Sequence, residues 1–315
     1  MRRRAFLLAP GLLTVPARAA TMPKAVASFS ILADMTRQIA GDRLEVVSLV
    51  PANTDPHAFQ PKASDSRVLA SAAVLVENGL GLEGWMTRLG EAAGFRGRRI
   101  VATTRVTPRT MKEGLAKEGL AKEGLAKEGL AKEGSAVSVD PHAWQNPRNG
   151  MLYVRAIAEG LSAAFPGGAE GWNANATRYI AAIEETDAWI ASRFAAIPPK
   201  DRRIVTTHDA FGYYGDRYGV TFLAARGVSP EAEPSAKGIA ALIRQIKREK
   251  VRAVFLENMS DPRTAAMLAR ETGAALSGPL FSDALSPPDG PAADYIAMLR
   301  HNTSLFERAM TSKGP

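Results

Sequence analysis

Residues 169–195 read AEGWNANATRYIAAIEETDAWIASRFA, a stretch with no proline and with no glycine after Gly171. Proline and glycine are the residues that interrupt helices, so this stretch predicts one long uninterrupted helix. Shorter segments that resemble strands and helices lie on both sides of it. We therefore expect a rigid helix that joins two lobes.

Both flanking halves alternate apolar, strand-like runs with helix-like runs, which predicts βα units around parallel sheets. We expect an N-terminal α/β lobe over residues 21–166, a linking helix over 167–197 and a C-terminal α/β lobe over 198–315. The expected strands are 25–29, 44–50, 73–76, 204–207, 221–224 and 253–256. The expected helices are 31–40, 64–71, 83–92, 211–218, 235–250, 262–272 and 295–310.

The first 20 residues have the composition of a cleavable signal peptide. Three arginines precede a short apolar run, and Ala17-Arg18-Ala19 offers a small-x-small cleavage site. The consecutive arginines also fit a twin-arginine signal, so we expect a periplasmic protein exported by the Sec or the twin-arginine route. No later segment is apolar for the 18 residues that a membrane span needs, so no stable membrane insertion is expected. The chain has no cysteine, which favours a free periplasmic monomer over a lipoprotein.

The net charge of +8 overstates how basic the expected mature protein is. Four of the 40 basic residues lie in the signal peptide, which leaves 36 basic against 32 acidic residues, a net charge of about +4. This is an ordinary value for a soluble protein, and no basic run is interleaved with aromatic residues. A nucleic-acid partner is therefore not expected.

Residues 110–136 contain a low-complexity repeat of the pentapeptide Lys-Glu-Gly-Leu-Ala. A glycine at every fifth position costs about 1 kcal/mol of helix stability per repeat relative to alanine, and a period of five fits neither helix nor strand. The segment has no histidine, and each glutamate follows a lysine. We expect a surface loop that takes no part in metal capture.

Two of the four histidines occupy the same position in a duplicated phrase. Residues 55–60 read DPHAFQ and residues 140–145 read DPHAWQ, so that His57 and His142 each follow Asp-Pro. Proline fixes a turn or extended geometry at this point, which holds the imidazole away from regular structure. Metal binding is the commonest role that recruits several imidazoles to one place.

Several phrases together resemble the metal-binding receptors of bacterial ABC importers for zinc and manganese, and the resemblance covers nearly all of the chain after the signal peptide. They are NTDPHAFQP at residues 53–61, NGLGLEGW at 78–85, DPHAW at 140–144, HDAFGY at 208–213 and FSDALS at 281–286. The resemblance implies two α/β lobes joined by one long helix, with metal in the cleft between them. It also implies an ABC permease as partner, and a metallochaperone as a further candidate.

The ligand set that the resemblance implies is His57, His142, His208 and Asp283. Three imidazoles and one carboxylate suit four-coordinate Zn²⁺. Some manganese receptors of the family have a carboxylate in place of His208, which favours zinc here; a manganese or iron receptor is the alternative. Asp283 is the weakest of the four, because Ser-Asp in a loop is also a common turn or helix cap.

Two other classes of function remain open from the sequence. A secreted zinc hydrolase would use three protein ligands, an open water position and a general base, but no His-Glu-x-x-His motif is present. A metal-independent adhesin would need no ligands. We expect a carrier rather than an enzyme, and we expect His301 to be a solvent-facing helix residue without a role. Glu257 receives no ligand role.

Overall fold

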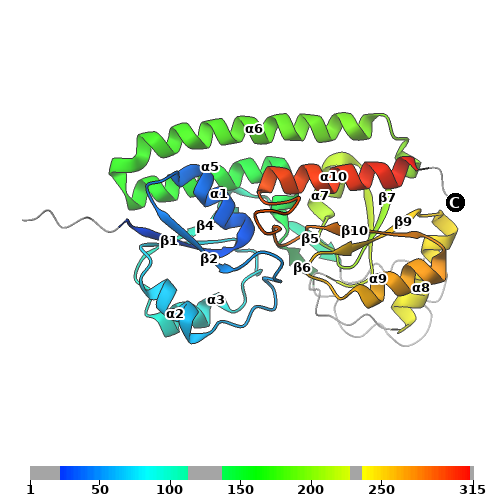
Figure 1. The fold of residues 1–315 in the computed structure, drawn as a ribbon, viewed down its shortest axis with the longest axis horizontal. Helices are drawn as coiled ribbons and strands as arrows, with labels where there is room; N and C mark the ends of the chain where they lie inside the picture. Colours follow the sequence, from blue (N-terminus) through cyan, green and yellow to red (C-terminus); the bar gives the residue numbers. More distant parts are fainter. Residues whose placement is uncertain (1–21, 113–136, 228–235, 313–315) are drawn as a thin grey trace, which may run out of the picture.

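The computed structural model describes residues 22–112, 137–227 and 236–312. The expected signal peptide and nearly all of the pentapeptide repeat lie outside these residues. Two α/β lobes lie side by side, and one long helix runs along both of them (Figure 1). The predicted fold class is therefore confirmed.

The N-terminal lobe is built on a four-stranded parallel sheet with the strand order β2-β1-β3-β4. Its central strand β1 is almost fully buried because helices cover the sheet, as parallel sheets require. The strands are β1 (Lys24–Phe29), β2 (Glu45–Val50), β3 (Val74–Glu77) and β4 (Arg98–Val101). The helices between them are α1 (Ser30–Ala40), α2 (Ala63–Ala70) and α3 (Met86–Ala93), and the 3₁₀ helix η1 (Ala102–Arg105) follows β4.

The C-terminal lobe has a second parallel sheet of four strands, in the order β10-β9-β7-β8. Its strands are β7 (Arg203–Thr206), β8 (Thr221–Ala224), β9 (Ala253–Glu257) and β10 (Ala275–Leu280). Its helices are α7 (Gly212–Tyr218), α8 (Ala236–Glu249), α9 (Pro262–Thr272) and α10 (Tyr295–Thr311). Strand β4, strand β10 and helix α5 (Pro147–Ala164) were not among the predicted elements.

The long helix α6 (Ala169–Ala195) spans the uninterrupted stretch and is two residues shorter at each end than the expected linking helix 167–197; it lies between the 3₁₀ helices η3 (Pro166–Gly168) and η4 (Pro199–Asp201). It packs on α1 and α5 of the first lobe and on α7 and α10 of the second. Its buried side chains, among them Ile183, Ile190 and Phe194, extend this contact along its length. Helix α6 therefore braces both lobes, besides connecting them.

A two-stranded antiparallel hairpin lies apart from the two parallel sheets. Strand β5 (Arg109–Lys112) pairs with β6 (Val137–Asp140), and Arg109 is the register partner of Asp140. At the other end of the hairpin Lys112 pairs with Val137, so the two residues that flank 113–136 lie side by side. The chain continues from β6 through the 3₁₀ helix η2 (Ala143–Gln145) into α5.

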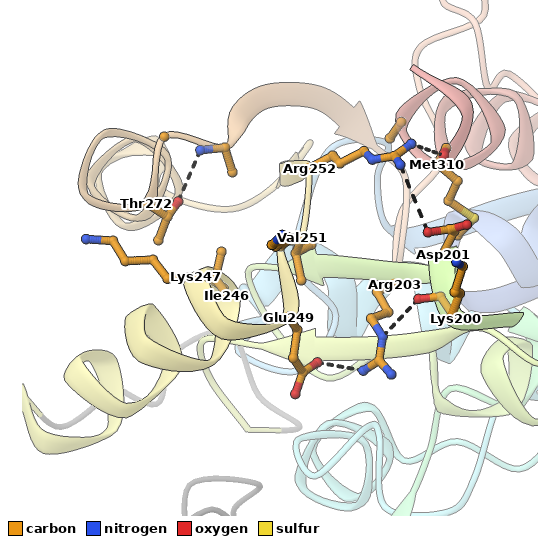
Figure 2. A pocket seen from close by; sticks show the side chains of 14 residues that line it. Lys200, Asp201, Arg203, Ile246, Lys247, Glu249, Val251, Arg252, Thr272 and Met310 are labelled. Carbon is orange, nitrogen blue, oxygen red and sulfur yellow. Dashed lines mark hydrogen bonds and ion pairs between the residues drawn. The ribbon is translucent and has the colours of Figure 1, made fainter. Parts of the chain in front are cut away.

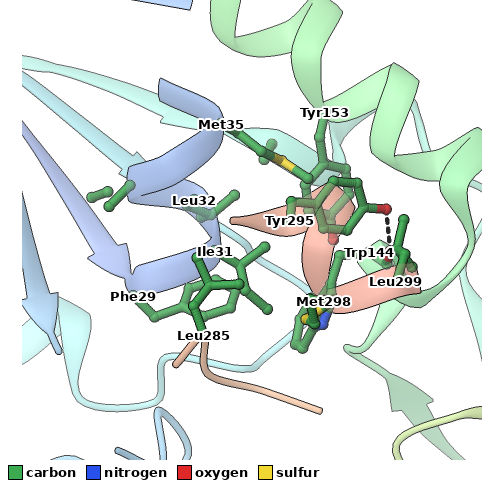
Figure 3. Close-up of a cluster of buried hydrophobic side chains, with 14 of the residues drawn as sticks. Phe29, Ile31, Leu32, Met35, Trp144, Tyr153, Leu285, Tyr295, Met298 and Leu299 are labelled. Atoms are coloured by element: carbon green, nitrogen blue, oxygen red, sulfur yellow. Dashed lines mark hydrogen bonds between the residues drawn. The ribbon is translucent and has the colours of Figure 1, made fainter. Parts of the chain in front are cut away.

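The apolar core continues from one lobe into the other. Figure 3 shows Ile31 and Leu32 of α1 together with Leu285, Trp144 and Tyr295, and all five side chains are buried. The same hydrophobic cluster includes residues of both parallel sheets. This shared core holds the lobes in a fixed relation beside the candidate site. Within the described ranges, no helix is both long enough and apolar enough to cross a membrane.

Candidate metal site

The four predicted ligand residues all follow the carboxyl ends of strands. His57 lies in the loop after β2, His142 after β6, His208 after β7 and Asp283 after β10. Loops at the carboxyl ends of parallel strands are the usual place for ligand sites in α/β folds. The structure brings all four residues together at the junction of the lobes, and each offers one atom within 4.8 Å of the others.

The distances between these atoms are short enough for a single ion to reach all four residues. The Nε2 atoms of His57 and His142 are 3.1 Å apart, and the His208 Nε2 lies 3.0 Å from the Asp283 Oδ2. The same Oδ2 is 3.4 Å from the His57 Nε2, and the Asp283 Oδ1 is 3.6 Å from the His142 Nε2. Ligands about 2.0–2.1 Å from a tetrahedral Zn²⁺ are about 3.3–3.4 Å from one another. These four distances, which involve both oxygens of Asp283, are therefore short enough for the residues to share one metal ion.

The four ionisable side chains of the cluster are almost completely buried. The side chains of His142, His208 and Asp283 are inaccessible to solvent, and that of His57 is 10% exposed. The Oδ1 of Asp283 is buried without a hydrogen-bond partner. A buried carboxylate oxygen normally has a partner, because burying a charge without compensation is costly. A bound cation would supply the missing interaction.

The two Asp-Pro-His turns are built alike. In each, the aspartate Oδ1 accepts a hydrogen bond from the backbone N–H of the histidine two residues later, at 2.7 Å for Asp55 and 3.0 Å for Asp140. This local bond closes a turn and aims the imidazole. The duplication in the sequence therefore reflects a repeated local geometry.

Residues 78–85 hold both turns from outside. The Trp85 Nε1 donates to the Pro56 carbonyl at 2.8 Å, and the Asn78 side chain donates to the Pro141 carbonyl at 3.0 Å. These carbonyls directly precede His57 and His142. One loop therefore sets the positions of both N-lobe imidazoles. This explains the structural role of Asn78 and Trp85 in the phrase NGLGLEGW.

In two of the histidines, the ring nitrogen that faces away from the cluster, Nδ1, lies against a buried carboxylate. The Asp140 Oδ1 is hydrogen-bonded to the His142 Nδ1 at 2.8 Å, whereas the Glu257 Oε2 makes an ion-pair contact with the His208 Nδ1 at 2.5 Å without the alignment of a hydrogen bond. A carboxylate on Nδ1 keeps the proton there and leaves Nε2 free to bind metal.

Glu257 was not given a role from the sequence, and the structure places it at the back of the site. Its Oε1 accepts from the backbone N–H groups of Thr207 and His208, each at 3.0 Å, and its Oε2 accepts from the Ser282 hydroxyl at 2.6 Å. It thus ties the loop after β7 to the loop after β10. The available signal was an acidic residue at the carboxyl end of a buried strand.

The electrostatics favour a cation at the centre. Burial alone would lower the pKa of His142, but the charge of Asp283 and the hydrogen bond to Asp140 outweigh it and raise the pKa to about 9. Burial is likewise outweighed at His208, where Glu257 and Asp283 raise the pKa well above the usual value. The neighbouring imidazolium charges hold the pKa of Asp283 well below its usual range against the effect of burial. Without metal, protons therefore take the place of the ion.

Hydrogen bonds across the lobe boundary hold the ligand loops together. The Trp144 Nε1 and the Gln145 Nε2 both donate to the Ser282 carbonyl, at 2.8 and 2.7 Å. The Leu285 N–H donates to the Ser30 hydroxyl at 3.0 Å. Because Trp144 follows His142 and Ser282 precedes Asp283, these bonds fix ligands of the two lobes relative to each other.

The fourth histidine lies outside the cluster, but it is not simply solvent-facing as expected. The ring of His301 in α10 packs against Phe281 with 5.3 Å between ring centroids, and its Nε2 is 3.0 Å from the Pro279 carbonyl oxygen. It therefore supports the segment that leads into the Asp283 loop. The helical spacing predicted the helix but not this tertiary contact.

A cavity of about 690 Å³ lies at the opposite edge of the C-terminal sheet (Figure 2). It is lined by residues at the amino ends of strands, such as Arg203 at the start of β7 and Arg252 just before β9. Arg203 pairs with Glu249 at 2.6 Å, and the Arg252 Nη1 donates to the Met310 carbonyl at 2.6 Å. These arginines are already engaged, and none of the four clustered residues lines this cavity.

Comparison with known proteins identifies the family. The family described as "Zinc-uptake complex component A periplasmic" matches residues 25–309. The manganese-binding lipoprotein MntA of Halalkalibacterium halodurans is 31% identical over 284 residues, which cover 90% of this chain and 87% of that protein. The iron ABC transporter substrate-binding lipoprotein MtsA of Streptococcus pyogenes is also 31% identical, over 89% of this chain and 86% of its own length.

Solved structures agree with this assignment. A structure from work on the metal-binding specificity of TroA has a TM-score of 0.81 at 27% identity and covers 92% of this chain and 100% of its own. The Mn-bound periplasmic metal-binding protein of Candidatus Liberibacter asiaticus has a TM-score of 0.76 at 26% identity, over 91% and 99% of the two chains. The protein thus belongs to the family of zinc-uptake complex component A, the metal-binding substrate receptors of ABC importers, which are not enzymes.

Proposed function

We propose that this protein binds one Zn²⁺ ion in the periplasm and delivers it to the membrane permease of an ABC importer. His57, His142, His208 and Asp283 are the proposed ligands. The observation that carries the proposal is four separations of 3.0–3.6 Å between their nitrogen and oxygen atoms, close to the spacing between ligands of a tetrahedral zinc ion. The division into lobes 21–166 and 198–315 around the linking helix, the monomeric state and export by a signal peptide are parts of the same proposal.

The donor atoms favour zinc over manganese. Three imidazole nitrogens and one carboxylate form a borderline set that suits Zn²⁺, whereas Mn²⁺ prefers more oxygen donors and six-coordinate sites. Asp140 and Glu257 hold two of the imidazoles in the orientation that leaves Nε2 as the donor. Three imidazoles and one carboxylate bring the charge of a bound Zn²⁺ site to about +1, and Asp140 and Glu257 place two further negative charges beside it.

A manganese or iron receptor is the second candidate. Relatives of this chain are named for manganese and for iron. Both oxygens of Asp283 also face the cluster, with Oδ2 near His57 and His208 and Oδ1 near His142. A bidentate carboxylate would raise the coordination number above four, which suits manganese or iron better than a closed zinc site.

A competition titration tests the preference for zinc; because zinc outcompetes manganese at most sites of this kind, retention of manganese is its decisive outcome. Purified mature protein is stripped of metal, loaded with one equivalent of Mn²⁺ and titrated with Zn²⁺ while bound metal is measured by elemental analysis. We expect one ion per chain and displacement of manganese by equimolar zinc. Retention of manganese under those conditions would support the second candidate, and binding of neither ion would refute the receptor function altogether.

A further inference from the structure

Arg109 connects the β5–β6 hairpin to helix α7 of the C-terminal lobe. Its Nη1 donates to the Asp140 Oδ2 at 3.1 Å, and its Nε donates to the Asp216 Oδ2 at 2.9 Å. Its backbone N–H donates to the Tyr213 hydroxyl at 2.7 Å. Asp216 and Tyr213 both lie on α7. One arginine thus binds residues of both lobes.

The carboxylate of Asp140 links Arg109 to the candidate metal site, because it contacts both Arg109 and His142. Its Oδ2 faces Arg109, while its Oδ1 lies 2.8 Å from the His142 Nδ1 and accepts from the His142 backbone N–H. The Asp140 side chain is fully buried, so water does not replace either partner. The Tyr213 hydroxyl also donates to the Asp140 carbonyl at 3.2 Å. Arg109 is therefore separated from a proposed ligand by a single carboxylate.

The first residue of α7 shows how closely the two lobes approach here. A Cβ atom at Gly212 would overlap the Arg109 guanidinium and lie 2.8 Å from the Asp140 Oδ2. Any larger residue would displace one of the two groups. Glycine at this position therefore permits the helix to lie directly against the Arg109–Asp140 pair.

We propose that Arg109 is a positioning residue for the metal site, which couples helix α7 to the orientation of His142 through Asp140 and thereby slows metal release. This inference rests on the proposed function. Without the guanidinium, the buried Oδ2 of Asp140 loses its charged partner, and the carboxylate is no longer held on the His142 ring. Groups that orient a metal-binding histidine typically change affinity by roughly 10- to 100-fold. Because Arg109 acts through Asp140, we expect the lower end of that range.

The test compares Arg109→Ala and Arg109→Lys with wild type and with Arg105→Ala. Arg105 forms an ion pair with Glu159 at 2.8 Å within the N-terminal lobe, and both side chains are more than half exposed, so it is a matched control. Zinc release into excess chelator is followed by stopped flow. The d–d spectrum of the Co²⁺-loaded protein reports the ligand geometry independently of the release rate.

We expect Arg109→Ala to release zinc about tenfold faster with an altered Co²⁺ spectrum. We expect Arg109→Lys, which keeps the charge but not the planar fork, to lie between it and wild type, and Arg105→Ala to match wild type. Asp216→Asn tests the connection between the lobes, and loss of this exposed ion pair predicts release about two- to fivefold faster. Melting curves of the metal-free variants identify loss of folding, in which case Arg109→Lys and Asp216→Asn decide the question.

Wild-type release rates and Co²⁺ spectra in both Arg109 variants would overturn the inference. Faster release in Arg109→Ala with no change in Asp216→Asn would overturn the coupling to α7. Failure of the wild-type protein to bind zinc would instead contradict the proposed function, so the two outcomes are distinguishable.

Discussion

Glu257→Gln is the substitution that tests most sharply how the site selects the metal-binding form of an imidazole. The Glu257 Oε2 lies 2.5 Å from the His208 Nδ1 in a fully buried position. Glutamine has nearly the same shape but presents an N–H₂ group to that nitrogen. His208 Nδ1 would then have to accept a hydrogen bond, which moves the ring proton to Nε2, the atom that faces the metal.

The expected loss of zinc affinity in Glu257→Gln follows from this shift of the ring proton and from the loss of one negative charge. Outer carboxylates on metal-binding histidines are worth roughly 10- to 100-fold in metal affinity. This corresponds to about 1.4–2.8 kcal/mol of binding free energy. The glutamine Oε1 can still accept from the backbone N–H groups of Thr207 and His208, so the loop itself keeps its anchor.

Zinc affinity is measured by competition with a chromophoric chelator at pH 7.5, for wild type, Glu257→Gln and Ser282→Ala. Ser282→Ala removes one hydrogen bond to the same carboxylate without changing the tautomer of His208. We expect a small loss in this control and the full loss in Glu257→Gln. An affinity of Glu257→Gln within threefold of wild type would refute the reasoning about the His208 tautomer.

Three further predictions concern the ligands, the pH and the hairpin. His208→Ala should abolish the rise in melting temperature that zinc produces by mass action, whereas His301→Ala should keep it, as thermal melts will show. Because the folded pKa of His142 is raised to about 9, the metal-free protein carries a proton there at neutral pH. Zinc affinity should therefore increase as the pH rises towards about 9, and calorimetry in buffers of different ionisation enthalpy should detect at least one proton released per zinc bound. Replacing residues 113–136 by Asn-Gly should leave zinc affinity within twofold of wild type, since the flanking residues already pair across the hairpin; a tenfold loss would show that the repeat takes part in binding.

Much of the fold was accessible from the sequence because its periodic segments are strong. Helix α9 has the predicted bounds, helix α6 spans the uninterrupted stretch, and most other predicted elements differ by one to three residues at an end. The missed elements are interrupted by glycine or proline. Helix α5 has a start signal, with Asn146 as its N-cap and Pro147 in its first turn, but it contains Gly150 and Gly160; β10 contains Gly278 and Pro279.

The site was predicted less completely than the fold. The four clustered residues stood out because each lies in a recognisable phrase. Glu257 carries no such phrase, and its role arises only when β9 is placed beside β7 in the sheet. Arg109 and Asp216 are 107 positions apart, and only the packing of the lobes brings them together.

The central claim is a four-coordinate zinc ion held between the lobes, and a zinc-edge X-ray absorption spectrum of the one-to-one complex tests it most directly. Our account predicts three nitrogen donors and one oxygen donor at about 2.0–2.2 Å. His142→Ala and Asp283→Ala, which remove one ligand from each lobe, should each lower the number of protein donors by one. A six-coordinate, oxygen-rich spectrum that neither substitution changes would contradict the account.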